Sequence, residues 1–252
     1  MSAVSNFRDF GGVATAAGRH VRTGLLFRSG QTGPLGDTPF DALARLNFAV
    51  VADLRFPDEA AAAPMPWPKA LAGNVLEIGG ATAGGTAPHH AFLRARLGAV
   101  AEVRERYLDF YSGLPSDPRY MSLIGRTLTA AADADGPLLI HCSAGKDRTG
   151  IVCGLILSLL HVPVDAIVED YMLSAAPKAT SALRPEILRR IEDHGLSLPD
   201  EDVLDAMLAV EPDYLLAGFA AIEREFGSLA AYLEAIGVAP PVANRLRSRV
   251  LQ

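Results

Sequence analysis

The chain is poor in several features whose absence limits what it can be. It has two cysteines, Cys142 and Cys153, in 252 residues, too few for a disulfide framework, so a reducing, cytoplasmic compartment is expected. The cysteines form no C-x-x-C pair and no Cys/His spacing typical of zinc. No apolar run is long enough to span a bilayer. The N-terminus lacks a conventional secretion signal, although secretion by another route remains open.

Lysine is scarce, and the chain carries no excess of positive charge. Only three of its 23 basic residues are lysines, the formal net charge is −6, and the pI is about 5.5. This balance argues against coating nucleic acid or an anionic membrane by bulk charge, while a local basic pocket stays possible. We therefore expect no nucleic-acid partner and no integral membrane segment. Nothing in the sequence indicates an oligomeric state.

What is present is a pattern of short apolar runs and helical periods. Runs near 24–28, 48–55, 75–78 and 137–142 predict strands. Residues 57–88 are rich in Pro, Ala and Gly, 75–78 is the only strand-like piece among them, and GGATAGGTAPHH, residues 79–90, is predicted to be a mobile loop. Helical spacing predicts helices over 37–47, 90–112, 117–133, 148–160, 163–175, 184–194, 200–210, 212–226, 228–236 and 240–251. With half of its residues hydrophobic, the chain predicts a single α/β domain over 1–252, a central sheet flanked by helices with a helix-rich C-terminal third.

One segment places reactive side chains between two apolar runs. It reads HCSAGKDRTG, residues 141–150, after a predicted strand and before a predicted helix. A helix N-terminus gathers unpaired backbone N–H groups and partial positive charge, which favour an anion. The small residues Ser143, Ala144 and Gly145 let the backbone curl around a tetrahedral anion. We expect this loop to bind phosphate.

The same loop supplies groups for phosphoryl transfer. Cys142 lies at its centre, where backbone amides and Arg148 favour the nucleophilic thiolate. Arg148 can hold two phosphate oxygens with its planar fork, and Thr149 can offer its hydroxyl to the sulfur. Lys146 adds a positive charge that would suit a substrate with more than one phosphate.

The departing oxygen of a phosphate ester must be protonated, and a carboxylic acid is the usual donor. Asp147, inside the loop, is the first candidate. Asp53, at the carboxyl end of a predicted neighbouring strand, is the second. Both have a structural alternative, because Asp147 can stabilise a helix start and Asp53 can pair with Arg55.

HCSAGKDRTG resembles the signature loop of the cysteine-dependent protein tyrosine phosphatases. Its Lys-Asp pair resembles the bacterial atypical branch, the tyrosine phosphatase B-like enzymes, which act on phosphotyrosine and phosphoinositides. The segments NFRDFGG, LLFRSGQTG and VVADLR resemble the N-terminal part of that branch. IVEDYMLS and PDYLLAGFAAIEREFGSLAAYLEAIGV resemble its later part. The resemblance covers nearly the whole chain, and residues 57–110 match least.

The resemblance implies a hydrolase that forms a cysteinyl-phosphate on Cys142, with Arg148 as the phosphate clamp, Asp147 as the general acid and no metal or cofactor. It implies phosphotyrosine proteins as substrates, with phosphoinositides as a second class. The larger tyrosine phosphatases take their acid from a Trp-Pro-Asp loop. Here Trp67 and Pro68 are followed by a lysine, which favours Asp147. The branch can also carry a helical lid, which maps to about 176–211.

Two other classes of function remain. The chain could be an inactive phospho-recognition module on the same fold, in which case it would show no turnover. It could also be another thiol enzyme on a similar loop, a sulfurtransferase or arsenate reductase, which would transfer sulfur from thiosulfate or need a resolving cysteine. Cys153, inside the apolar stripe of the following helix, is expected to be a core residue and is badly placed for that role.

Polar residues beside the loop and near the N-terminus are given structural roles. His141 is expected to orient the loop through hydrogen bonds rather than to act as a base. Asn6, Arg8 and Asp9 are expected to fix a turn.

Overall fold

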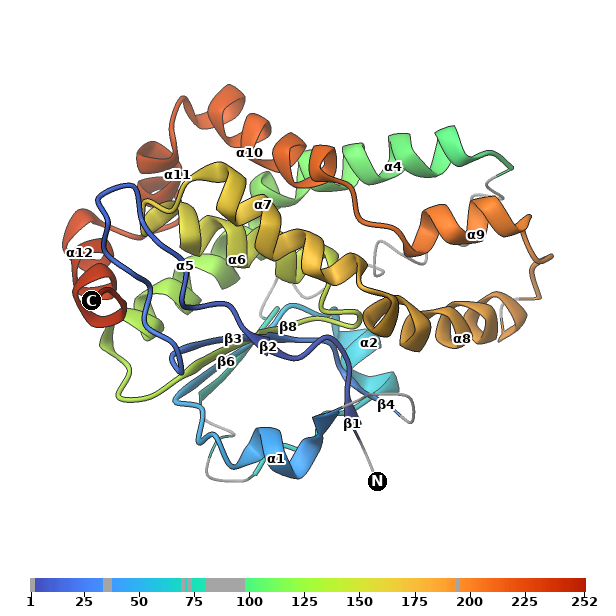
Figure 1. The fold of residues 1–252 in the computed structure, drawn as a ribbon, viewed down its shortest axis with the longest axis horizontal. Helices are drawn as coiled ribbons and strands as arrows, with labels where there is room; N and C mark the ends of the chain where they lie inside the picture. The colour runs from blue at the N-terminus through green and yellow to red at the C-terminus, as the bar shows by residue number, and fades with distance from the viewer. Residues whose placement is uncertain (1–2, 34–37, 69–70, 72–73, 80–97, 194) are drawn as a thin grey trace.

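A computed structural model describes residues 3–33, 38–68, 71, 74–79, 98–193 and 195–252. At its centre lies a five-stranded sheet (Figure 1). In spatial order its strands are β2 (Arg8–Asp9), β3 (Leu26–Ser29), β8 (Leu138–His141), β6 (Val50–Asp53) and β7 (Val75–Glu77). Neighbouring strands run parallel except for β2 and β3, which are antiparallel. The predicted α/β fold with a central sheet is confirmed.

Both faces of the sheet are covered, which explains why its central strands read as continuous apolar runs. Successive side chains of a strand point to opposite faces. On one face Ala52 and Ile140 pack against α5 (Pro118–Asp133), α6 (Asp147–Leu159) and α12 (Pro240–Val250). On the other face Val51 and Leu139 pack against α1 (Phe40–Ala44). Figure 1 shows α1 below the sheet and the larger helical layer above it.

The remaining elements are mostly helical. They are α2 (Pro57–Ala62), α4 (Val100–Gly113), α7 (Val164–Met172), α8 (Pro177–Asp193), α9 (Glu201–Leu208), α10 (Pro212–Phe226) and α11 (Leu229–Ala235), with short 3-10 helices at Leu114–Ser116 and Leu173–Ala175. A small antiparallel sheet joins β1 (Ala3–Val4) to β4 (Thr32–Gly33) and β5 (Thr38–Pro39). Among the described residues, no helix has both the length and the apolar character that crossing a membrane requires.

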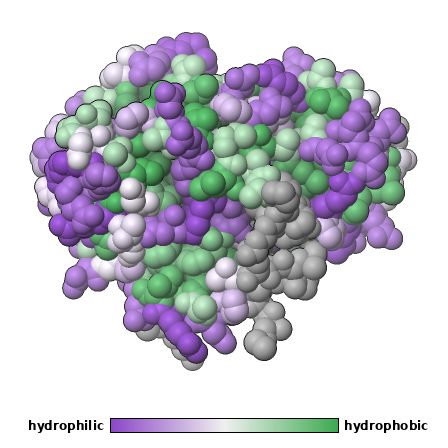
Figure 2. All heavy atoms as spheres, viewed as in Figure 1, coloured by the Kyte–Doolittle hydropathy of each residue, from purple (hydrophilic) through white to green (hydrophobic). Residues whose placement is uncertain are grey.

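Helices α8 and α9 project from the main body beside α4 (Figure 1). A small apolar cluster joins the three helices and consists of Val103, Ile191, Val203 and Met207. Arg184 of α8 forms ion pairs with Glu201 and Asp205 of α9. Hydrophilic side chains cover much of the outer surface in this view, including a large part of the region formed by α8 and α9 (Figure 2). Residues 176–211 therefore include a helical pair held to the body largely through α4.

Three sequence expectations differ from the structure. Residues 57–62 form helix α2, where no helix is predicted from the sequence, and all but the first residue of the predicted loop at 79–90 lies outside the described residues. The string FPDEAAA carries a helix-start pattern that the proline and alanine content obscured, with Pro57 at the first helical position and acidic residues in the first turn. Helix α8 begins at Pro177 and contains Pro185. The sequence instead predicts a helix that begins at residue 184, directly before this proline. Helix α1 covers only Phe40–Ala44, and residues 90–97 of another predicted helix lie outside the described part of the chain.

Candidate active site

The loop 142–146 leaves the sheet at the carboxyl end of its central strand. In the sheet, His141 of β8 is in register with Ser29 of β3 on one side and with Asp53 of β6 on the other. The chain then turns through five residues and enters α6 at Asp147. The carboxyl edge of parallel strands is where open α/β sheets place their ligands. The structure therefore has the strand–loop–helix arrangement that the sequence predicts for an anion site.

The sulfur of Cys142 faces the inside of this loop. The Gly145 N–H donates to Cys142 Sγ at 3.2 Å, and the cysteine is 2% exposed. Gly145 has a φ of +67° in the left-handed region, and a Cβ at this position would lie 2.4 Å from the Gly30 nitrogen. Only glycine fits this turn without displacing the neighbouring backbone. The small residue at 145 therefore lets the loop bend tightly enough to bring an amide onto the sulfur.

A carboxylate from α2 holds Arg148 beside the loop. The two terminal nitrogens of Arg148 donate to Glu59 Oε2 and Oε1 at 2.6 and 2.8 Å, and the Ser143 hydroxyl also donates to Glu59. Arg148 and Glu59 are both buried. Burial alone would lower the pKa of Arg148, but the Glu59 charge raises it well above its usual range. The sequence did not single out Glu59, which lies in a Pro-, Ala- and Gly-rich segment where no helix is predicted.

Two buried tyrosines fix the carboxylate of Asp147. Asp147 lies in the first turn of α6 and accepts a hydrogen bond of 2.8 Å from the Tyr111 hydroxyl. The hydroxyls of Tyr111 and Tyr171 lie 2.7 Å apart. Burial, and then the charge of Asp147, raise the pKa of Tyr111 well above its usual value, so the phenol keeps its proton. Neither tyrosine stood out in the sequence, where both lie within ordinary helical patterns.

Lys146 is directed toward α9. Its ammonium donates to the backbone oxygens of Met207, Leu208 and Ala209 at 3.2, 3.3 and 2.9 Å. It also lies 4.9 Å above the ring of Tyr107. These carbonyls are the unpaired acceptors at the C-terminal end of α9, so the lysine caps that helix. Burial lowers the pKa of Lys146. A role for it in substrate binding stays a prediction, since in this arrangement its ammonium faces the end of α9 and lies 3.7 Å from the Asp147 carboxylate.

The remaining residues of the motif are partly or fully buried. Ser143 and Ala144 are half-buried, and the Ser143 backbone oxygen accepts from the Gln31 N–H at 3.0 Å. Thr149 is fully buried, and its hydroxyl has no hydrogen-bond partner within the described part of the chain. A donor from Thr149 to the sulfur or to a bound oxyanion therefore stays a prediction.

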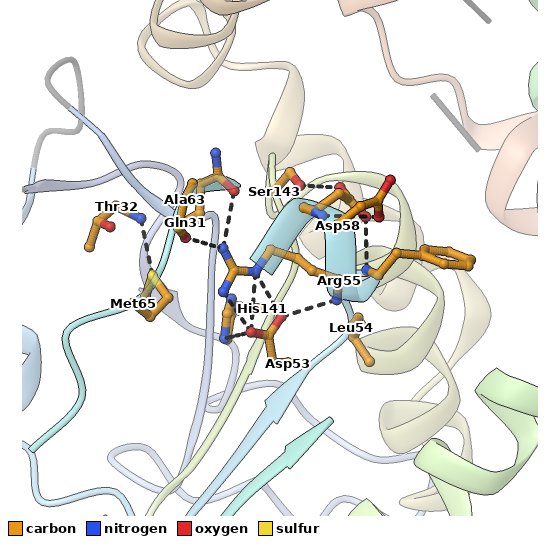
Figure 3. Close-up of polar contacts among 12 residues, drawn as sticks. Gln31, Thr32, Asp53, Leu54, Arg55, Asp58, Ala63, Met65, His141 and Ser143 are labelled. Carbon is orange, nitrogen blue, oxygen red and sulfur yellow. Dashed lines mark hydrogen bonds and ion pairs between the residues drawn. The ribbon is translucent and has the colours of Figure 1, made fainter. Parts of the chain in front are cut away.

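Asp53 is tied to Arg55 rather than left open toward the loop (Figure 3). The carboxylate accepts from Arg55 Nε at 2.9 Å and from Arg55 Nη2 at 2.7 Å. His141 Nε2 lies 3.5 Å from the same carboxylate, and Arg55 donates further to the Ala63 backbone oxygen at 2.6 Å. Against the effect of burial, His141 and Arg55 lower the pKa of Asp53. This geometry favours the structural alternative for Asp53 and leaves Asp147 as the better candidate for the acid.

His141 is packed at the end of β8. The imidazole is fully buried, and its ring centre lies 5.8 Å from that of Trp67. Burial lowers its pKa to about 4, so the ring is neutral near pH 7. The backbone of His141 is bound to the residue that follows β6, where the Leu54 N–H donates to the His141 oxygen at 2.8 Å. As for a metal, no three His, Cys, Asp or Glu side chains of the described residues converge to hold one.

Comparison with known proteins agrees with this geometry. A model of the tyrosine phosphatase family matches residues 1–252. The triple specificity protein phosphatase PtpB of Mycobacterium tuberculosis is 30% identical over 270 aligned residues, which cover 98% of this chain and 96% of that protein. A tyrosine-protein phosphatase of Nostoc commune is 30% identical over 232 residues, covering 89% of this chain and 74% of that protein. The resemblance carried by the signature loop is confirmed, and the chain belongs to the tyrosine phosphatase family.

Proposed function

We propose that the chain hydrolyses phosphotyrosine in proteins through a cysteinyl-phosphate on Cys142, with phosphoinositides as a second substrate class. The observation that carries this proposal is the amide of Gly145 donating to the Cys142 sulfur inside a tight loop. Such a donor stabilises the thiolate, which is the nucleophilic form of cysteine. The adjacent helix N-terminus supplies N–H donors, and Arg148 supplies a positive charge, for a phosphate dianion.

In the first step the sulfur attacks phosphorus, so that a P–S bond forms as the ester P–O bond breaks. The leaving oxygen takes the electron pair of that bond and a proton from Asp147. In the second step a water molecule attacks phosphorus and gives a proton to Asp147. The P–S bond breaks, which regenerates the thiolate of Cys142 and releases inorganic phosphate. Arg148, held by Glu59 at 2.6 and 2.8 Å, stabilises the charge on the transferring group in both steps.

The broader substrate range rests on two observations. PtpB of Mycobacterium tuberculosis is described as a triple specificity phosphatase. Lys146 adds a cation in the loop that a second phosphate could bind once its contacts with α9 are released. We propose that α8 and α9 serve as a lid over the site, because Cys142 and Arg148 are 2% and 6% exposed and α9 is tied to the loop through Lys146.

The alternative thiol chemistries have less support. A resolving cysteine must approach the first one and form a thiolate. Cys153 is fully buried, and burial raises its pKa to about 12, so it remains a thiol. An inactive binding module would retain the fold and lose turnover, which only an assay distinguishes.

The proposal is tested with the full chain on an aryl phosphate, a phosphotyrosine peptide, a phosphoserine peptide and phosphoinositides, with and without a chelator. We expect hydrolysis of the aryl phosphate, the phosphotyrosine peptide and the phosphoinositides, unaffected by the chelator. Cys142→Ser should abolish it, and Cys153→Ser, the matched thiol control, should retain it. Full hydrolysis by Cys142→Ser would overturn the proposal, as would thiosulfate-dependent sulfur transfer without phosphatase activity.

A further inference from the structure

The outer side of the catalytic loop is bound by two donors from distant parts of the chain. The Gly145 backbone oxygen accepts from Asn6 Nδ2 at 2.7 Å and from Arg28 Nη2 at 3.1 Å. Asn6 lies between β1 and β2, and Arg28 lies on β3. Both of the oxygen's acceptor positions are therefore used by side chains that lie outside the loop.

The orientation of this carbonyl determines where the next amide points. A trans peptide is planar, so the Lys146 N–H points opposite to the Gly145 carbonyl. The carbonyl faces Asn6 and Arg28, and the N–H therefore faces away from them. A loop that binds a phosphate must turn its N–H groups inward and its carbonyls outward. Without donors on the outer side, this peptide could rotate and present its oxygen, which would repel an anion.

We propose that Asn6 and Arg28 are positioning residues that hold the Gly145–Lys146 peptide with its N–H directed at the bound phosphate. This inference rests on the proposed function of the loop and extends it to two residues outside the signature motif. Neither residue needs to touch the substrate. Both act through the Gly145 carbonyl, and Arg28 also lies 3.5 Å from the next carbonyl, that of Lys146.

The surroundings of Arg28 support the assignment. Arg28 is fully buried and forms an ion pair of 2.7 Å with Asp170, which also pairs with Arg8 at 3.3 Å. The Ser174 hydroxyl lies 3.4 Å from Arg28 Nη2 and 3.2 Å from Arg8 Nη2. Two guanidinium groups thus share one carboxylate behind the loop. The excess positive charge is costly without an anion nearby, and a phosphate or thiolate in the loop would supply one.

The residues of the N-terminal segment NFRD form both local and distant contacts. The expected turn belongs to Asp9, whose carboxylate accepts from the N–H groups of Gly11 and Gly24. Asn6 and Arg8 also bind each other within this segment, where Arg8 Nη1 donates to Asn6 Oδ1 at 2.5 Å, and each reaches a distant part of the chain as well, Asn6 the Gly145 oxygen and Arg8 the side chain and backbone of Asp170. Asp9 therefore offers a control in the same segment, with two hydrogen bonds and no contact between its carboxylate and the loop.

The test measures the affinity of the full chain for inorganic phosphate by titration calorimetry, a reading that needs no turnover. Asn6→Ala should weaken phosphate binding by about tenfold, since one hydrogen bond that holds the peptide is lost. Asn6→Asp should weaken it further, because it sets a carboxylate against the Gly145 oxygen. The control Asp9→Ala should lower the melting temperature and leave phosphate affinity within about twofold of the original protein.

A second reading follows alkylation of Cys142 by iodoacetamide as a function of pH. In Asn6→Ala the reactive form should appear at higher pH than in the original protein, and in Asp9→Ala it should not. The inference is overturned if Asn6→Ala binds phosphate as tightly as the original protein, or if Asp9→Ala weakens binding equally. If the original protein binds phosphate with this pattern but hydrolyses no ester, the proposed function fails and the positioning role stands. If the original protein binds no phosphate, both fail.

Discussion

Glu59 binds Arg148 at two points, with oxygen–nitrogen distances of 2.6 and 2.8 Å, and both side chains are buried. A two-point contact fixes the plane of the guanidinium as well as its position. The guanidinium that we propose as the phosphate clamp is therefore fixed in this structure by a carboxylate from a helix 89 residues earlier in the chain.

Replacing Glu59 by Gln should damage both stability and phosphate binding. The substitution leaves the buried Arg148 charge without its counter-charge, which costs on the order of 3 kcal/mol of unfolding free energy. Urea denaturation measures that loss, and titration with inorganic phosphate measures the loss of affinity. Asp58→Asn, in the same turn of α2, is the control: the exposed side chain accepts from the Glu59 N–H at 3.0 Å, an acceptor oxygen that asparagine retains, so this variant should change little. A Glu59→Gln protein as stable and as active as the original would contradict this account of Arg148.

Asp147→Asn should reduce hydrolysis in proportion to how poor the leaving group is. Loss of a positioned acid typically costs a factor of about 10² to 10⁴, and that cost applies when the leaving oxygen needs a proton. We expect a large loss of kcat/KM on phenyl phosphate and a small one on an aryl phosphate with an acidic phenol. Equal losses on both substrates would show that Asp147 is structural.

The tyrosines behind Asp147 give a matched pair for the same assay. Tyr111→Phe removes the hydrogen bond to the carboxylate and should repeat the leaving-group pattern at about a tenfold loss. Tyr171→Phe removes the bond to Tyr111 alone and should have a smaller effect. The reverse order of effects would exclude Tyr111 as the residue that orients the acid.

Lys146→Met should loosen α9. The three backbone oxygens at the end of that helix lose their common donor, so amide hydrogen exchange in residues 201–208 should accelerate by about tenfold. Arg104→Met is the control, because Arg104, a cation on α4, forms exposed ion pairs with Glu211 and Asp213, which contribute little. Unchanged exchange in Lys146→Met would show that the lysine does not anchor α9.

Stability should fall in mild acid because of His141. Its folded-state pKa is about 4, against an ordinary value of 6.5, so between these values the unfolded chain binds a proton that the folded chain does not. The contribution of His141 to the free energy of unfolding is thus fully present above pH 6.5. It is lost as the pH falls toward 4, and the loss amounts to about 3 kcal/mol. Urea denaturation between pH 4.5 and 6.5 should show a shallower decline in His141→Asn. Identical slopes would contradict the assignment.

Much of the site is contiguous in the chain, which is why it could be predicted. Cys142, Asp147 and Arg148 lie within residues 142–148, from the start of the loop to the first turn of α6, and the buried strand before them and the apolar helix that follows are visible as hydrophobic runs. The covered faces of the sheet gave those runs their continuous apolar character.

The partners of these residues could not be predicted in the same way. Glu59, Tyr111 and Asn6 reach the loop or the start of α6 from segments 36 to 139 residues away, and no local pattern encodes such contacts. The direction of Lys146 likewise depends on where the end of α9 packs. Only the start of α2 carried a local signal, with Pro57 at its first position and acidic residues in its first turn, and the alanine and proline content of the segment obscured it.

The central claim is that Cys142 carries the phosphoryl group during turnover. The direct measurement is mass spectrometry of the protein quenched rapidly during hydrolysis of an aryl phosphate, followed by mapping of the modified peptide. We predict one added phosphoryl group on the peptide containing Cys142, present in Cys153→Ser and absent in Cys142→Ser. Active turnover with no phosphorylated cysteine, or with the phosphoryl group on another residue, would contradict the account.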